Sequence, residues 1–167
     1  MSDLLEDAGV KRVVAALVAA RHPSDVLTLK STAATAKDAA RAVGCEPGAI
    51  VKSLVFLVGD RFALALVAGD RTCVPENLPR ALNLKGTARL AEPGEVRFAT
   101  GFAPGGVAPV GLARKLACVM DRSLKRFETV FASAGHPHCV FPTTADRLKE
   151  MTGAIVSYNI ASEPGGG

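Results

Sequence analysis

The sequence contains no tryptophan, and only eight of its 167 residues are aromatic. Proteins that bind single-stranded nucleic acid by stacking its bases use a platform of aromatic side chains, and nothing in this chain indicates one. Long charged tracts are missing too: the net charge is +4, yet no five like charges follow one another. Such a charge is compatible with an anionic partner and equally with ordinary solubility, so composition leaves the partner open.

Other absences concern disulfides, membranes and secretion. No CxxC pair occurs among the scattered cysteines, which are Cys45, Cys73, Cys118 and Cys139. This pattern indicates free, mostly buried thiols rather than a disulfide scaffold. The first seven residues carry three acidic side chains where a secretory signal would be positive. No apolar run reaches the ~20 residues that span a bilayer. We therefore expect a cytoplasmic protein with no membrane partner.

Several well-known catalytic and nucleotide-binding motifs are absent. No GxSxG, HExxH or paired-carboxylate motif supports a serine triad, a zinc protease or a glycosidase. Neither GxxxxGK[ST] nor GxGxxG is present, which removes the two common nucleotide fingerprints. The length suits one domain, and we find no internal repeat or linker. We expect a single domain over residues 1–162 and a disordered, glycine-rich tail at 163–167.

The spacing of apolar residues predicts helices that alternate with strands. A valine and leucine stripe at helical spacing predicts an amphipathic helix over residues 3–20. Thr35 and Gly44 have the character of the N-cap and the left-handed stop of a second helix. Further helices are predicted over 78–84, over 93–100 and, from caps at Thr143 and Asp146, up to Gly153.

Two apolar runs, 50–58 and 62–68, flank the short turn Gly59-Asp60-Arg61 and predict an antiparallel hairpin. Both faces of both runs are apolar, so the hairpin belongs in the middle of a sheet that is covered on both sides or curled into a barrel. Other strands are predicted over 25–29, 87–90, 116–120, 128–133 and 138–141. The hairpins exclude a purely parallel sheet, and a mixed α/β (α+β) fold with a curved sheet inside helices fits best.

Lys52 is the only charged residue in the run Ile50–Val58. Alternation along a strand places it on the same face as Leu54 and Phe56. An ammonium buried without a partner is costly, so Lys52 must reach water or meet an anion. It either extends its stem to solvent or forms a cationic floor for a phosphate or a polarised carbonyl. The pattern alone does not decide between the two.

The segment Gly101–Gly111 holds four glycines and two prolines in eleven residues. These residues fix an unusual backbone path and leave successive N–H groups without side-chain cover. Such a loop can present amides to an oxyanion or a phosphate, or it can be a purely structural turn between a helix and a strand.

The segment Ser133–Cys139 contains His136, His138 and Cys139, which are residue types that bind zinc. Alternation separates adjacent strand residues, however, and no fourth ligand has a matching spacing. We therefore favour a hairpin turn with an exposed histidine, and expect no metal and no cofactor.

Read together, three stretches resemble the YbaK/prolyl-tRNA-synthetase-associated editing family. They are Thr35–Ala40 with Gly44 and Ile50–Phe56, then Thr100-Gly101 through Gly111, and then Ser133-Ala134-Gly135. The family comprises freestanding aminoacyl-tRNA deacylases and the editing insertion of bacterial prolyl-tRNA synthetases. The similarity runs from about residue 25 to 157.

The resemblance implies a barrel-like mixed sheet surrounded by helices. It also implies hydrolysis of the ester that joins a wrong amino acid to the terminal adenosine of a tRNA. Lys52 falls on the family's motif lysine, and we expect it to act in catalysis with the loop amides of Gly105 and Gly106. The expected substrate-binding residues are Gly101, Phe102, Pro104, Val107, Pro109, Ser133, Gly135 and His136. The implied partners are the tRNA acceptor end and, transiently, prolyl-tRNA synthetase.

One departure from the family concerns the residues just beyond the glycine turn. Some members carry an acidic residue there, whereas this chain has His136-Pro137-His138-Cys139, so His136 is a candidate for its role. The leading hypothesis is a trans-editing deacylase that removes a small amino acid, such as alanine, serine or cysteine, from tRNA-Pro. The alternatives are a non-catalytic module that binds a tRNA 3′ end or a nucleotide, and an unrelated small-ligand hydrolase.

Overall fold

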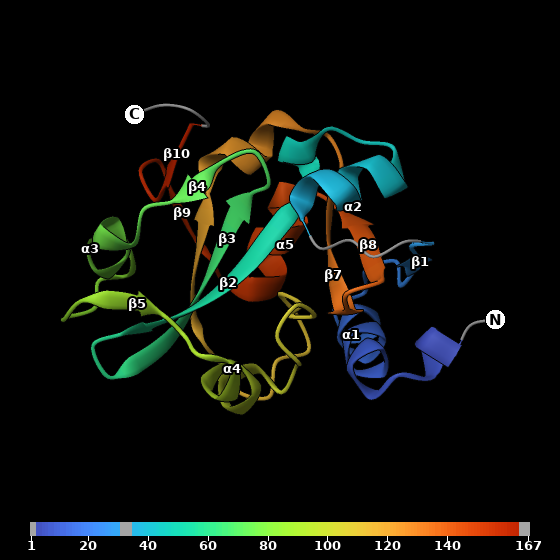
Figure 1. Cartoon of the computed structure of the whole chain (residues 1–167), viewed down its shortest axis with the longest axis horizontal. Helices are drawn as coiled ribbons and strands as arrows, with labels where there is room; N and C mark the ends of the chain where they lie inside the picture. The colour runs from blue at the N-terminus through green and yellow to red at the C-terminus, as the bar shows by residue number, and fades with distance from the viewer. Residues whose placement is uncertain (1–2, 31–34, 164–167) are drawn as a thin grey trace.

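The computed structural model describes residues 3–30 and 35–163, which form an α+β fold (Figure 1). The helices are α1 (Ala8–Ala19), α2 (Ala36–Val43), α3 (Leu78–Leu82), α4 (Pro93–Thr100) and α5 (Ala145–Thr152). The strands are β1 (Leu27–Thr28), β2 (Val51–Val58), β3 (Arg61–Ala68), β4 (Thr72–Cys73), β5 (Ala88–Leu90), β6 (Ala117–Asp121), β7 (Val130–His136), β8 (Cys139–Thr143), β9 (Ile155–Ser157) and β10 (Ala161–Ser162). Short 3-10 helices lie at Asp3–Glu6, Pro47–Ala49, Pro75–Asn77 and Arg122–Arg126.

The main sheet has the strand order β5-β2-β3-β6-β9. Its first three strands are antiparallel, whereas β6 runs parallel to both β3 and β9, so the mixed sheet expected from the sequence is confirmed. The expected barrel-like closure of the sheet is wrong, because the edge strands β5 and β9 do not pair within the described residues. Both are only three residues long and lie on opposite sides of the hairpin, so the sheet stays open.

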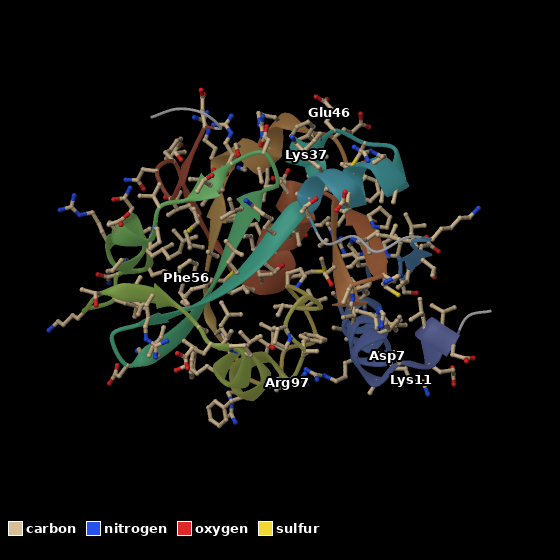
Figure 2. The ribbon with its side chains drawn as sticks, in the orientation of Figure 1. Asp7, Lys11, Lys37, Glu46, Phe56 and Arg97 are labelled. Atoms are coloured by element: carbon tan, nitrogen blue, oxygen red, sulfur yellow. The ribbon has the colours of Figure 1, made fainter. Side chains whose placement is uncertain are left out.

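The hairpin of β2 and β3 is covered on both faces, as its apolar composition predicted. Val51 and Val55 of β2 belong to the larger core, which includes residues of α1, α4, β7 and β8. Phe56 and Val58 point to the opposite face, where Leu78 of α3 is part of a second core. Figure 2 shows Phe56 on this side of β2. The hairpin therefore serves two cores at once, which fixes the position of β2 firmly.

A second sheet, of order β1-β8-β7, lies beside the first. The two sheets are linked by an isolated parallel bridge between Ile50 and Phe131. Beyond this bridge β2 and β7 diverge, and the segment after α4 crosses the space between their lower ends (Figure 1). This divergence creates the hollow that is described below.

The element boundaries depart from the sequence expectations at two helix starts. The first predicted helix splits because Asp7 is an extended N-cap whose carboxylate accepts from the N–H groups of Gly9 and Val10. The last helix is capped by Thr144, which accepts from the N–H of Arg147, and the expected cap at Thr143 is wrong by one residue. The short strands β4, β9 and β10 were not predicted.

The thiols are free, but only two of the four are buried. Cys118 and Cys139 are buried, whereas Cys45 and Cys73 are partly exposed. Burial raises the pKa of Cys118 to about 12. No helix in the described residues is both long and apolar enough to cross a membrane. Of the predicted tail, residues 164–167 lie outside the described residues.

Candidate functional site

A cavity of about 580 Å³ lies where β2 and β7 diverge. Its walls are the start of α2, the first half of β2, the end of β7 with the following turn, and the loop after α4. The wall residues include five of the sequence-predicted site residues: Lys52, Gly105, Val107, Ser133 and His136. Residues far apart in the chain thus meet in one hollow, whose volume is in the range of ordinary small-ligand sites.

The cavity lies along an open edge of β2. Gly69 donates its N–H to the carbonyl of Ile50 on one side of β2, and Ala91 donates to the carbonyl of Val55 on the other. Because successive residues of a strand direct their peptide groups to opposite edges, the peptide group of Ser53 faces the same side as that of Val55. Among the described residues, β5 covers this side at residues 56–58 and Ala91 extends the cover to Val55, which leaves Ser53 beyond it. The Oγ of Ser53 is also buried and has no hydrogen-bond partner within the described chain.

Lys52 is half-buried in the cavity wall, and its ammonium donates a hydrogen bond to the carbonyl of Arg71. Burial lowers the pKa of Lys52, while the nearby Cys73 thiol and the carboxylates of Asp70 and Asp121 oppose this shift. An ammonium has three N–H donors, and Arg71 takes one of them. Lys52 is therefore anchored rather than extended into solvent, and it keeps donor capacity for a bound anion or carbonyl.

The loop presents its tightest turn to the cavity. Gly106 donates its N–H to the carbonyl of Ala103 at 2.9 Å, with Pro104 and Gly105 at the two central positions. Gly105 has φ +87°, and a proline followed by a glycine at positive φ is the pattern of a type II turn. The turn uses the N–H of Gly106 but leaves that of Gly105 without a partner among the described residues. Of the two amides expected to act in catalysis, Gly105 is the one with a donor to offer.

The opposite wall is the end of β7, where the pairing with β8 shifts register between Ser133 and His136. Gly135 occupies this irregularity with φ +94°. The next residue, His136, accepts a hydrogen bond at Nδ1 from the N–H of His138 at 3.0 Å. A neutral imidazole that accepts at Nδ1 carries its proton on Nε2. His136 is thereby arranged as a hydrogen-bond donor rather than as a base at Nε2.

The charged residues that line the cavity are positive. Lys37 and Lys52 are in its wall, and none of the described residues that line it is acidic. Lys37 comes from the first turn of α2, a helix whose N-cap is Thr35 (Figure 2). The positive end of the α2 dipole adds to the two lysines, so the site favours an anionic or strongly polar ligand.

The remaining sequence-predicted residues lie outside the cavity wall. Gly101 ends α4 with φ +80°, Phe102 is buried in the larger core, and Pro104 is exposed on the turn. Gly106 packs against the backbone of residues 135–136, and Gly135 packs against Gly9. Pro109 lines a different hollow of about 420 Å³ on the far side of the loop.

Several wall residues were missed by sequence reasoning. They are chiefly Thr35, Lys37, Ser53, Phe131, Pro137 and Val140. Ser53 carried a signal, since a lone hydroxyl beside Lys52 in an apolar strand needs a partner when buried. For Phe131 and Val140 the sequence offers no such signal, because a wall made of core-type side chains is indistinguishable from core.

Comparison with known proteins identifies the family. The model of the aminoacyl-tRNA editing domain matches residues 30–151. The chain belongs to the aminoacyl-tRNA editing domain family. The solved structure of a candidate trans-editing enzyme for prolyl-tRNA synthetase is similar to this editing domain, with a TM-score of 0.85 and 38% identity over 91% of this chain and 96% of that one.

Two further relatives place the editing domain in different settings. The uncharacterized protein YwhH of Bacillus subtilis is 33% identical over 84% of this chain and 88% of its own length. A proline–tRNA ligase of Bacillus velezensis is 35% identical over 48% of this chain, which spans only 14% of the ligase. The similarity thus includes nearly whole small proteins as well as a small part of a large one.

Proposed function

We propose that this editing domain is a trans-editing deacylase, which hydrolyses the ester of a mischarged aminoacyl-tRNA. The observation that carries the proposal is the meeting of Lys52 and Gly105 in one cavity, whose described lining residues include no carboxylate. An editing role in trans is supported by the likeness to the candidate trans-editing enzyme, which extends over 96% of that chain. The tRNA acceptor end would be the ligand, and prolyl-tRNA synthetase a transient partner.

The reaction breaks the bond between the aminoacyl carbonyl carbon and the ribose oxygen of the terminal adenosine. A water oxygen adds to the carbonyl, its proton passes to the departing ribose oxygen, and the products are the free amino acid and the uncharged tRNA. The N–H of Gly105 would donate to the oxyanion that develops on the carbonyl. We infer assistance from the vicinal ribose hydroxyl, because His136 is held in the form that donates at Nε2.

Lys52 and Lys37 would hold the phosphate and sugar of the terminal nucleotide, contacts that position a substrate without reading its sequence. The peptide group and free hydroxyl of Ser53 would meet polar groups of the aminoacyl-adenosine at the open edge of β2. Ser133, Val107 and His136 would complete the wall around it.

The substrate would carry a small amino acid on tRNA-Pro. Burial of one methylene is worth only about 0.8 kcal/mol, so an editing site selects small residues chiefly by excluding larger ones. Alanine, serine and cysteine all meet this condition.

A panel of mischarged tRNAs tests the proposal. We expect the protein to release alanine, serine or cysteine from tRNA-Pro well above the spontaneous rate and to spare correctly charged prolyl-tRNA, measured as loss of labelled aminoacyl ester with time. Tight binding of uncharged tRNA without cleavage of any ester would instead identify a non-catalytic module. Binding that weakens as salt rises would separate tRNA recognition from a small-ligand hydrolase.

The role of His136 gives a second expected result. Because Nδ1 of His136 accepts from the N–H of His138, the side chain should contact the substrate through a hydrogen bond donated by Nε2. His136→Gln places an amide donor near that position, whereas His136→Asn places one near Nδ1. We expect His136→Asn to lower kcat/KM by about three- to tenfold, the worth of one hydrogen bond, and His136→Gln to lose less. Equal losses in the two variants would contradict the donor role.

A further inference from the structure

Arg12 of α1 binds both ends of the loop that forms one wall of the cavity. Its Nη1 donates to the carbonyl of Gly101 at 2.9 Å and its Nη2 to that of Thr100 at 2.8 Å. Its Nε donates to the carbonyl of Gly111 at 3.1 Å, and Nη2 also contacts this oxygen. The guanidinium lies 4.5 Å from the centre of the Phe102 ring. One side chain thus joins the first and last residues of segment 101–111.

We propose that Arg12 is a positioning residue for deacylation, which holds segment 101–111 closed so that the Gly105 amide keeps its place in the cavity wall. This inference rests on the proposed function. It assigns a role to α1, which precedes the residues matched by the family model. Figure 2 labels Asp7 and Lys11 at the start of this helix, and Arg12 directly follows Lys11.

The ends of the loop are joined chiefly by Arg12, whereas its middle is held by the burial of Val107, Ala108 and Val110. Within the described residues, one direct backbone hydrogen bond crosses the base of the loop, from the N–H of Ala113 to the carbonyl of Thr100 at 2.9 Å. The glycines at 101, 105, 106 and 111 give this segment more freedom in the open state than other residues would. Ordering these residues costs backbone entropy, so the contacts that Arg12 makes at the base of the loop favour the closed conformation.

The helix also touches the end of β7, the strand that forms the opposite wall of the cavity. A Cβ at Gly9 would lie 2.6 Å from the carbonyl oxygen of Gly135, and a Cβ at Gly135 would lie 2.6 Å from that of Gly9. At Gly111 it would lie 3.0 Å from the carbonyl oxygen of Arg12. The backbones of α1, of the β7 irregularity and of the loop therefore touch with no room for side chains. Arg12 and Gly9 together set the spacing between Gly105 on one wall and His136 on the other.

The contacts require an arginine. A guanidinium has five donors in a rigid planar fork, so it can bind several carbonyls in one plane while its face packs on a ring. A lysine retains the charge, but its single ammonium cannot reproduce the fork or the packing on Phe102.

The test compares wild type, Arg12→Ala and Arg12→Lys. We expect kcat for a cleavable mischarged tRNA to fall by about tenfold to a hundredfold in Arg12→Ala, as misplacement of a catalytic group predicts, with KM changed much less. Arg12→Lys should stay close to Arg12→Ala. Low concentrations of guanidinium, too dilute to unfold the protein, should restore part of kcat in Arg12→Ala and none in wild type.

Arg147→Ala is the matched control. Its Nη2 binds the carbonyls of Ala20 and Arg21 at the far end of α1, at 3.2 and 3.4 Å. This variant loses a comparable arginine-to-backbone contact but should keep the wild-type kcat. If Arg12→Ala loses no more activity than Arg147→Ala, or if Arg12→Lys acts as wild type, the inference is overturned.

Hydrogen exchange without substrate separates the two proposals. The amides of Gly106 and Ala113 should exchange faster in Arg12→Ala than in wild type. In Arg147→Ala their exchange rates should equal those of wild type. If the exchange rates of these amides are unchanged in Arg12→Ala, Arg12 does not hold the loop closed, whatever the activity of the variant. If the exchange responds as expected but wild type cleaves no ester in the panel, the proposed function fails and with it the role of Arg12 in deacylation.

Discussion

Replacement of Lys52 with methionine is expected to reduce kcat/KM for deacylation by about tenfold to a hundredfold, the loss that follows removal of one hydrogen bond to a charged group of the substrate. Methionine fills a similar volume without the ammonium, so the cavity wall stays intact while its anchored cation disappears. The measurement is kcat/KM on the most rapidly cleaved mischarged tRNA. Lys85→Met, which changes an exposed lysine away from the cavity, serves as the matched control and should behave as wild type.

The same variant should be folded and at least as stable as wild type. The folded state holds the Lys52 ammonium half-buried, which lowers its pKa below the usual value of about 10.5. The pKa of this lysine is lower in the folded state than in the unfolded state. At a pH between these two pKa values the folded state therefore binds fewer protons than the unfolded state, and stability rises with pH. Wild type therefore bears the full desolvation penalty at neutral pH and is relieved of it toward pH 10.5.

It follows that any stability gained by Lys52→Met should be largest near neutral pH and should shrink as the pH approaches 10.5. Denaturant midpoints at a series of pH values provide the measurement. A variant that unfolds at neutral pH would show that Lys52 is a structural residue. A folded variant with wild-type kcat/KM would remove Lys52 from the site.

Local rules predicted much of the frame on which this site is built. The paired apolar runs around Gly59 predicted the hairpin and its burial on both faces. Thr35 and Gly44 are the N-cap and C-cap of α2, as expected. Pro93 and Gly101 start and end α4 at the predicted positions. Each of these signals depends on residues close together in the chain, where capping and turn chemistry dominate the backbone conformation.

The sheet closure was mispredicted because it depends on how distant edges meet. Pairing of β6 with β9 brings together residues more than thirty positions apart, and no local pattern indicates that β5 and β9 stay separate. The short strands β4 and β10 were missed for a similar reason, since two-residue strands have no periodicity to detect.

The division of labour within the loop also lies beyond sequence patterns. Gly105 and Gly106 are identical in type and adjacent, yet the amide of Gly106 closes the turn, whereas that of Gly105 has no partner among the described residues and its residue lines the cavity. Arg12 gave no signal at all, because a charged residue on an amphipathic helix is ordinarily solvated. Gly9 gave a faint one: an isolated glycine in a helical pattern can mark close approach of another backbone.

The position of Phe102 was also not predicted from the sequence, and its replacement should have a large effect on stability. The resemblance placed it among substrate-binding residues, but its side chain is 2% exposed and belongs to the larger core. It packs beneath Gly9 and Gly135, whose added Cβ atoms would lie 3.4 and 3.1 Å from its ring. The Arg12 guanidinium lies over the face of its ring. Phe102 is thus the point on which the loop, α1 and β7 converge.

Truncation of Phe102 to alanine should therefore cost about 3–5 kcal/mol of unfolding free energy, as for other buried aromatic residues. Phe102→Leu keeps most of the volume and should cost roughly 1–2 kcal/mol. Phe98→Ala is the control, because Phe98 is 58% exposed on α4 and mainly stacks on Arg114; its loss should be about 1 kcal/mol or less. Urea unfolding at equilibrium gives the three values. If Phe102→Ala is no less stable than Phe98→Ala but has a raised KM, the ring contacts substrate and the core position is wrong.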